Sequence, residues 1–135
     1  MTYSISKEFS FSAAHRLSGL YPGHPCGRVH GHNYTVKVAL TGPLSEVGFV
    51  RDYGLLSPLK AYLDEELDHR WLGKGILFDP QQGTLPDQIQ PVFDWNPTAE
   101  NMAEHLYRWC KGMWPEVAGV GVSETPKTWA WYEGF

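Results

Sequence analysis

Two segments in the first third of the chain alternate apolar and polar residues with a period of two, which is typical of strands that bury one face. In residues 3–15 the apolar face ends in a histidine, and in residues 30–41 it begins with two histidines. The positions predicted to face inward are Phe9, Phe11, Ala13 and His15 in the first segment and His30, His32, Tyr34, Val36, Val38 and Leu40 in the second. The pattern therefore places three imidazoles on the buried side of two strands.

Helical spacing of apolar residues replaces this alternation in two later segments. Residues 52–67 have leucines at helical spacing, and Pro58 fits this helix only in its first turn. Thr98 is a suitable cap for a second helix. The buried face of that helix is predicted to consist of Ala99, Met102, Ala103, Leu106, Trp109, Cys110 and Met113. Residues 73–97, with three glycines and four prolines, are predicted to form a long irregular loop.

Residues 117–125 and 128–133 are predicted to form two final strands, with a turn at Pro126 and Lys127 between them. The order strand, strand, helix, helix, strand, strand predicts an α+β fold with a four-stranded antiparallel sheet, in a single domain over residues 1–135. Two helices can cover one face of such a sheet, so its other face and its edges need a partner. We therefore expect a homo-oligomer.

Composition and charge narrow the classes of partner. The 135 residues include 11 lysines and arginines against 15 aspartates and glutamates, without a basic run that would follow a phosphate backbone, so we expect no nucleic acid partner. The first residues lack the apolar core of a signal peptide, and no apolar run approaches the ~20 residues of a membrane span, so we expect no membrane partner. Cys26 and Cys110 do not suggest a disulfide framework, which makes a reducing cytoplasm the expected location.

The three inward-facing histidines suggest a metal site. His30 and His32 project from one face of a strand, and His15 ends another strand on its apolar face, so the three rings can converge. Buried imidazoles need polar partners, and a shared metal supplies all three at once. Zinc suits this set, and three histidines leave a fourth position for water or substrate. For His24, in a Pro/Gly turn, and His105, beside the apolar stripe of the second helix, we expect structural or surface roles.

Cys26 lies shortly before His30 and admits two interpretations. As a fourth ligand it would complete a closed Cys-His₃ shell, which is typical of structural zinc sites. Held off the metal, it would be a thiolate whose pKa a nearby cation lowers, able to act as a base or nucleophile. The spacing alone leaves both interpretations open.

Three further residues carry groups that could take part in chemistry. Asp68 and His69 end the first predicted helix, where they could form a proton relay if folding brings them to the thiol, or a solvated aspartate beside a helix C-terminal cation. Glu124 shares the phase of Val120 and Val122, so its carboxylate is predicted to point inward and to need a donor. An amino-pyrimidinone edge could donate two hydrogen bonds to it, and a structural ion pair is the alternative.

The motifs around these residues occur in a recognisable order. The chain contains, in sequence, FSAAHRL, CGRVHGHNY, GFVRDYGLL, LDHRWL, PTAEN and SETPKTWAWY, which extend from Phe9 to Tyr132. In this order they resemble the 6-pyruvoyl-tetrahydropterin synthase superfamily. The three residues between Cys26 and His30 are similar to its 6-carboxy-tetrahydropterin synthase branch, the branch of queuosine biosynthesis, because the pyruvoyl branch typically has a longer gap.

This resemblance implies a T-fold: a four-stranded antiparallel sheet with two helices on one face, closed into a barrel by trimerisation, with two trimers forming a hexamer and active sites at subunit interfaces. It also implies a small-molecule pterin substrate, 7,8-dihydroneopterin triphosphate, converted to 6-carboxy-5,6,7,8-tetrahydropterin with release of acetaldehyde and triphosphate. The alternatives are triphosphate elimination by a 6-pyruvoyl-tetrahydropterin synthase, a non-catalytic zinc-stabilised pterin-binding protein, and the same chemistry in a 7-deazapurine natural-product pathway.

The resemblance also implies a role for each motif residue. His15, His30 and His32 would bind zinc, Cys26 would be the general base, and His69 would be a second proton carrier oriented by Asp68. Glu124 would hold the pterin ring, with Thr98 of a neighbouring subunit contributing. The connection between His69 and Pro97 departs from the pattern by its length, and it could cover the pocket or extend an oligomer interface.

Overall fold

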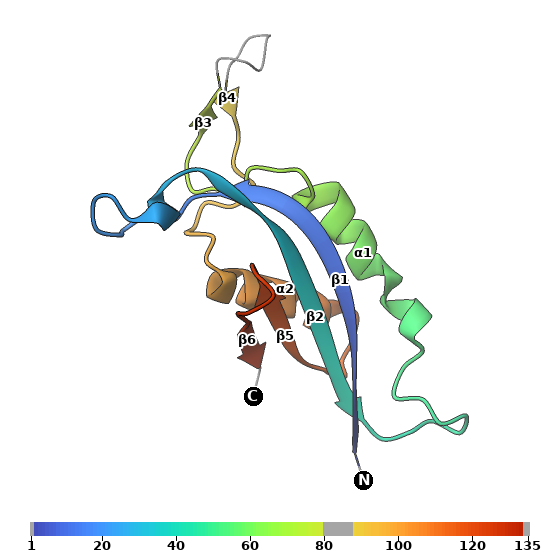
Figure 1. The fold of residues 1–135 in the computed structure, drawn as a ribbon. Coiled ribbons are helices and arrows are strands. Elements are labelled where there is room, and N and C mark those ends of the chain that lie inside the picture. The colour runs from blue at the N-terminus through green and yellow to red at the C-terminus, as the bar shows by residue number, and fades with distance from the viewer. Residues whose placement is uncertain (1, 80–87, 134–135) are drawn as a thin grey trace.

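A four-stranded antiparallel sheet forms the centre of the fold (Figure 1). The computed structural model describes residues 2–79 and 88–133. The strands lie in the order β1-β2-β5-β6, so the first and last of them are the edges of the sheet. The strands are β1 (Tyr3–His15), β2 (His30–Gly42), β5 (Val117–Ser123) and β6 (Ala130–Glu133).

The helices occupy the two predicted segments. The first is built from consecutive pieces of different winding, and Pro58 lies in the first turn of α1, where its missing N–H leaves no hydrogen bond unmade. The second begins where the Thr98 hydroxyl accepts a hydrogen bond from the backbone N–H of Asn101 at 3.1 Å, as its cap position predicts. The helical elements are the 3₁₀ turns Pro25–Gly27 and Tyr53–Leu56, α1 (Ser57–Tyr62), the π-helical turn Leu63–Leu67 and α2 (Ala99–Met113).

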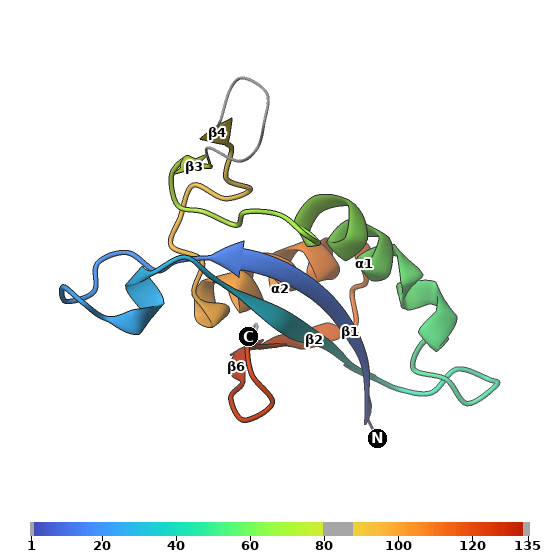
Figure 2. The ribbon, with the colours of Figure 1, turned by 45° about the horizontal axis from the view of Figure 1, so that its top comes forward.

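Both helical segments cover the same face of the sheet, as the pattern predicts (Figures 1 and 2). The Tyr62 ring of α1 stacks on the Trp109 ring of α2 with centroids 4.8 Å apart. A continuous hydrophobic core joins the two layers and includes the inward residues of β1 and β2 from Phe9 and Tyr34 onward. The fully buried leucines at helical spacing are Leu56, Leu59, Leu63 and Leu67. The alternation in the sequence therefore assigns the strand faces correctly.

The predicted irregular loop over residues 73–97 is partly wrong. It contains a small antiparallel hairpin of two strands, β3 (Leu77–Phe78) and β4 (Gln88–Ile89), which projects from the rest of the fold (Figure 2). Residues 80–87 of this prediction lie outside the described part of the chain. A ladder of two residues on each side is too short to leave a periodic signal between so many glycines and prolines.

Two boundaries near the end of the chain also differ from the prediction. Met113 is 46% exposed rather than buried, because the backbone becomes extended at the next residue and turns the Trp114 side chain into the core. The turn before β6 is longer than predicted, because β5 ends two residues earlier, at Ser123, and β6 begins two residues later, at Ala130. The Ser123 hydroxyl donates to the carbonyl of Thr125, and the N–H of Thr128 donates to the same carbonyl at 3.2 Å, so local bonds replace the ladder.

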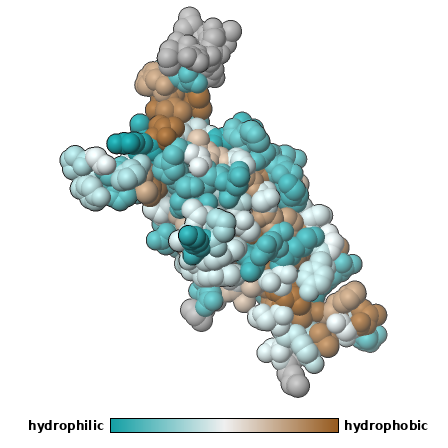
Figure 3. Space-filling view, in the orientation of Figure 1, coloured by the Kyte–Doolittle hydropathy of each residue, from teal (hydrophilic) through white to brown (hydrophobic). Residues whose placement is uncertain are grey.

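Exposed apolar side chains gather at two ends of the molecule (Figure 3). One group lies on the β3–β4 hairpin, where Phe78 is 68% exposed, and the other on the loop after β2, where Val47 is 75% exposed and Phe49 lies nearby in sequence. Apolar groups of this kind are common at contact surfaces. Among the described residues, no helix is long and apolar enough to span a membrane.

Candidate metal centre and active site

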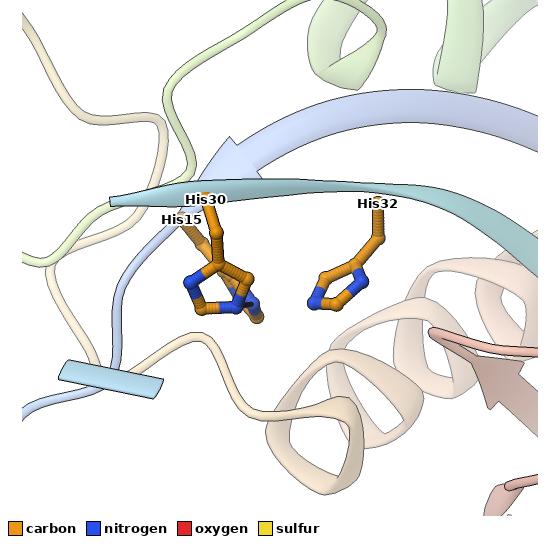
Figure 4. A group of neighbouring side chains, drawn as sticks. All are labelled: His15, His30 and His32. Atoms are coloured by element: carbon orange, nitrogen blue, oxygen red, sulfur yellow. Dashed lines mark hydrogen bonds between the residues drawn. The ribbon is translucent and has the colours of Figure 1, made fainter. Parts of the chain in front are cut away.

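The register of β1 and β2 brings the three predicted histidines together. His15 pairs directly with His30, and Ala13 pairs with His32, so the three side chains leave neighbouring positions on the inward face of the ladder. Figure 4 shows the rings reaching from the two strands into one space. One nitrogen of each ring lies within 4.8 Å of the others, so the three residues could hold a metal ion.

Two of these rings are oriented by backbone carbonyls. Nδ1 of His15 lies 2.9 Å from the carbonyl oxygen of Pro97, and Nδ1 of His30 lies 2.7 Å from the carbonyl oxygen of Arg28. A carbonyl can only accept a hydrogen bond, so each Nδ1 carries the proton and each Nε2 presents a lone pair. The two Nε2 atoms lie 3.0 Å apart, which is a natural separation for two ligands of one small cation.

Burial keeps His15 and His32 neutral. Desolvation lowers the pKa of His15 to about 4, and the neighbouring His30 and His32 rings lower it further, against the opposing effect of the Pro97 carbonyl. Desolvation also lowers the pKa of His32, and the Glu124 carboxylate opposes that shift. Metal ligands must be deprotonated, so at neutral pH the rings of His15 and His32 are ready to bind without first losing a proton.

The Nε2 atom of His32 is buried and makes no hydrogen bond within the described structure. An unsatisfied buried nitrogen is costly, and together with the Nε2 atoms of His15 and His30, which contact each other, it makes a donor set that fits a metal ion. Sequence and structure thus agree on the three ligands of a candidate metal centre.

Glu124 lies immediately after β5 and points at this centre. Its Oε2 atom is 3.0 Å from Nε2 of His32 and 3.8 Å from Nε2 of His15. The contact with His32 has the length of an ion pair but lacks the direction of a hydrogen bond, since the same nitrogen has no hydrogen-bond partner. The predicted inward direction of this carboxylate therefore agrees with the structure, and the carboxylate borders the space where a ligand of the metal would lie.

Cys26 lies in the 3₁₀ turn Pro25–Gly27 just before β2 and is partly buried. Its thiol is not among the grouped ligand atoms, which come from three histidines only. The closed Cys-His₃ shell is therefore not the arrangement that the described residues adopt. Both Cys26 and Cys110 are free thiols.

Asp68 and His69 lie along the free edge of β1. The Asp68 Oδ1 atom accepts the backbone N–H of Ser12 at 2.8 Å, and its Oδ2 atom is 2.8 Å from Nδ1 of His69. The Ser12 contact and then the His69 contact lower the pKa of Asp68. His69 adopts the left-handed region at φ 60, and its N–H donates to the Ser12 carbonyl at 2.6 Å. Such a conformation is costly for a residue with a side chain and is common at functional sites.

The His69 side chain is largely exposed to solvent. It is 83% exposed and borders a cavity of about 500 Å³ beside residues 12–14 of β1 and 31–33 of β2. This cavity is lined by outward-facing residues such as Ser12 and Asn33, by the inward-facing residues Ala13 and His32, and by Leu77 and Ile89 of the hairpin. Neither Asp68 nor His69 is among the grouped ligand atoms, so within one chain the described residues do not add the predicted proton relay to the cluster of three histidines.

Comparison with known proteins accounts for this combination of fold and site. A sequence model of the family described as 6-pyruvoyl tetrahydropterin synthase matches residues 4–134. The chain belongs to this family. The 6-carboxy-5,6,7,8-tetrahydropterin synthase of Aquifex aeolicus is 30% identical to it, over 97% of this chain and 93% of the relative. The Rickettsia felis protein of the same name is also 30% identical, over 75% of each chain.

A solved structure supports the same assignment. The 6-pyruvoyl tetrahydropterin synthase of Caenorhabditis elegans superimposes with a TM-score of 0.75 at 28% identity, covering 100% of this chain and 97% of that one. The chain is therefore an enzyme of the 6-pyruvoyl tetrahydropterin synthase family with the T-fold, and the predicted fold class is confirmed.

Several residues that support this family site escaped the sequence analysis. The carbonyls of Pro97 and Arg28 orient two of the histidines, and a backbone carbonyl has no signature in a sequence. The Tyr34 hydroxyl lies 3.0 Å from Nδ1 of His15, and desolvation raises its pKa, so it stays protonated. Of these groups, only the Tyr34 side chain could have been recognised from the sequence as part of the site, because Tyr34 continues the inward-facing alternation of His30 and His32 along β2.

The remaining histidines behave as expected from their sequence context. His105 lies partly buried on α2, with its Nε2 2.7 Å from the Tyr62 hydroxyl, and burial lowers its pKa. His24 accepts a hydrogen bond from the backbone N–H of Cys26 at 3.0 Å. Neither ring belongs to the grouped ligand atoms, and the contacts of both are with other parts of the protein.

Proposed function

We propose that the chain is a zinc-dependent carbon–carbon lyase that converts 7,8-dihydroneopterin triphosphate to 6-carboxy-5,6,7,8-tetrahydropterin, acetaldehyde and triphosphate. The observation that carries this proposal is the convergence of three imidazoles, one with a buried Nε2 atom that has no hydrogen-bond partner, beside the Glu124 carboxylate. The names of the Aquifex and Rickettsia relatives support the carboxy-pterin product over the pyruvoyl product. We propose that this reaction serves queuosine or 7-deazapurine biosynthesis in the cytoplasm. A single domain over residues 1–135 would carry it out.

His15, His30 and His32 would hold the zinc ion through their Nε2 atoms, because backbone carbonyls occupy Nδ1 of His15 and His30 and the Nε2 atom of His32 has no hydrogen-bond partner. Bound there, zinc would supply a Lewis acid that polarises the side-chain hydroxyls of the substrate. The three nitrogens leave a fourth coordination position, as catalytic zinc sites require.

The protein residues around this position would transfer protons and bind the pterin ring. Cys26, which is free and partly buried near the start of β2, would take a proton from the substrate side chain. His69 would be the second proton carrier, with Asp68 fixing its ring through the 2.8 Å contact. Glu124 would accept hydrogen bonds from the amino and ring N–H groups of the pterin. Thr98 of a neighbouring subunit would add a polar contact besides its role as a cap.

A site shared between subunits is part of this proposal. His69 is exposed and is not grouped with the three histidines of its own chain, so the relay of one copy would serve the zinc of another. The exposed apolar groups and the open edges of the sheet favour such an assembly, which we propose to be a hexamer made of two trimers.

Coexpression of two inactive variants tests whether the site is shared. Cys26→Ala and His69→Ala should each be inactive alone, whereas mixed oligomers should regain activity at about a quarter of their sites, because each mixed interface can pair an intact thiol with an intact imidazole. The measurement is turnover of the coexpressed protein against each variant purified alone. A mixture no more active than its parts would show that both residues act within one chain.

Product identity tests the reaction itself. The protein is incubated with 7,8-dihydroneopterin triphosphate, the pterin product is identified by mass, and acetaldehyde is trapped as a hydrazone. We expect the 6-carboxy product with one equivalent of acetaldehyde. A 6-pyruvoyl product without acetaldehyde would assign the chain to triphosphate elimination instead.

A further inference from the structure

The segment that carries Cys26 is a single turn with little support of its own. It spans Pro25–Gly27, and two backbone hydrogen bonds close it: Gly27 N–H to the His24 carbonyl at 3.0 Å and Arg28 N–H to the Pro25 carbonyl at 3.1 Å. One isolated turn is marginal in water, because it fixes several dihedral angles for few bonds. The conformation of Cys26 therefore depends on contacts from outside the turn.

The first such contact comes from His24, two residues before the cysteine. Its Nδ1 atom accepts the backbone N–H of Cys26 at 3.0 Å, in the manner of a helix cap. That N–H has no other acceptor among the bonds of the turn, so the imidazole satisfies a group that would otherwise be left to solvent.

The imidazole is itself held in place. The ring of Tyr21 lies edge-on to it with centroids 4.8 Å apart, and the backbone N–H of His24 donates to the Tyr21 carbonyl at 3.2 Å. His24 is also partly buried, unlike the two prolines and the glycine beside it. Its ring is therefore a fixed acceptor rather than a mobile surface group.

The second contact joins the cysteine to the end of β1. The backbone N–H of Leu17 donates to the Cys26 carbonyl at 2.8 Å. Leu17 lies two residues after His15, so this bond ties the turn to the strand that supplies one of the candidate metal ligands. The two polar backbone groups of Cys26 are thus bound from two sides, one by His24 and one by Leu17.

We propose that His24 is a positioning residue for Cys26: its Nδ1 atom fixes the backbone of the turn, and thereby the direction from which the thiol approaches the substrate. This inference rests on the proposed function only for its effect on turnover. The hydrogen bond itself makes a structural claim that can be measured on an inactive protein. A nucleophile or base displaced by about 1 Å can lose about 100-fold in rate, so a fixed turn has a large effect on the chemical step.

Asparagine and leucine provide a matched pair of replacements at His24, since they have nearly the same shape. The amide oxygen of asparagine can accept the N–H two residues on, as it does in an Asx turn, and leucine has no acceptor. His24→Leu should lower kcat by about 10- to 100-fold with little change in KM, and His24→Asn should restore kcat to within about threefold of the parent. Zinc content should be equal in both, because His24 lies outside the grouped ligand atoms.

Hydrogen–deuterium exchange of peptides covering residues 17–29 provides the readout that does not need activity. We expect faster uptake in this segment in His24→Leu and uptake like that of the parent in His24→Asn, with unchanged exchange elsewhere. Equal kcat in parent and His24→Leu would overturn the proposal, as would an equal loss in both variants. If the parent protein does not turn over the pterin while the exchange difference is present, the proposed function fails and the positioning of Cys26 by His24 stands.

Discussion

Replacing Cys26 with alanine should lower kcat by about 10²- to 10⁴-fold, the usual contribution of a positioned general base, and should leave zinc bound. The expected result follows from the position of the thiol, which lies in the turn before β2 and outside the group of three histidine nitrogens. The measurement is turnover together with zinc content by atomic absorption on the same preparation. A Cys26→Ala protein that loses its zinc would instead support the non-catalytic interpretation, with the thiol as a structural ligand.

Cys110 offers a matched control for this variant. It is fully buried on α2, and burial raises the pKa of its thiol to about 12, so it is neither accessible nor ionised at neutral pH. Cys110→Ala should keep both zinc and turnover, with a loss of stability of about 1 kcal/mol or more from the small cavity left in the core. A comparable loss of turnover in Cys110→Ala would show that the effect of the first variant is not specific to Cys26.

Replacing His32 with alanine should remove the metal and the activity together. The Nε2 atom of this residue is buried without a hydrogen-bond partner among the described residues, and a bound metal ion would supply one. We expect zinc affinity to fall by more than about 100-fold, the upper end of what the loss of even an outer hydrogen-bond partner costs a metal site. The affinity is measured by competition with a chromogenic chelator, alongside kcat.

His105 provides the control for this second variant. It is a partly buried histidine whose ring contacts Tyr62 and lies outside the grouped ligand atoms. His105→Ala should lower stability, because it leaves the Tyr62 hydroxyl without its partner, and should bind zinc as tightly as the parent. Retention of tight zinc binding by His32→Ala would refute the three-histidine site.

The sequence predicted the strand faces and the cluster of three histidines that could hold a metal ion, because both follow from local rules. A period of two decides which side chains of β1 and β2 point inward, and the pairing of His15 with His30 needs only that the two strands meet at these ends. Glu124 was found in the same way, by extending the phase of Val120 and Val122 beyond the end of β5. These residues lie where the pattern of the chain places them.

The place of Asp68 and His69 could not be predicted in this way. It depends on backbone bonds to Ser12 at the free edge of β1, more than fifty residues earlier, and no local pattern encodes that contact. The same holds for the Pro97 carbonyl that orients His15 across 82 positions of sequence. Met113 was misassigned because the helix ends there, and the following tryptophan, not the methionine, turns into the core.

The central claim is that zinc held by the three histidines makes this chain a lyase that releases acetaldehyde from 7,8-dihydroneopterin triphosphate. Its most direct test compares acetaldehyde release by the purified protein, by the same protein after removal of metal with a chelator, and after zinc is added back. We predict release by the first sample, none by the second, and recovery in the third in proportion to zinc bound at one ion per chain. Equal acetaldehyde release with and without zinc would contradict the claim.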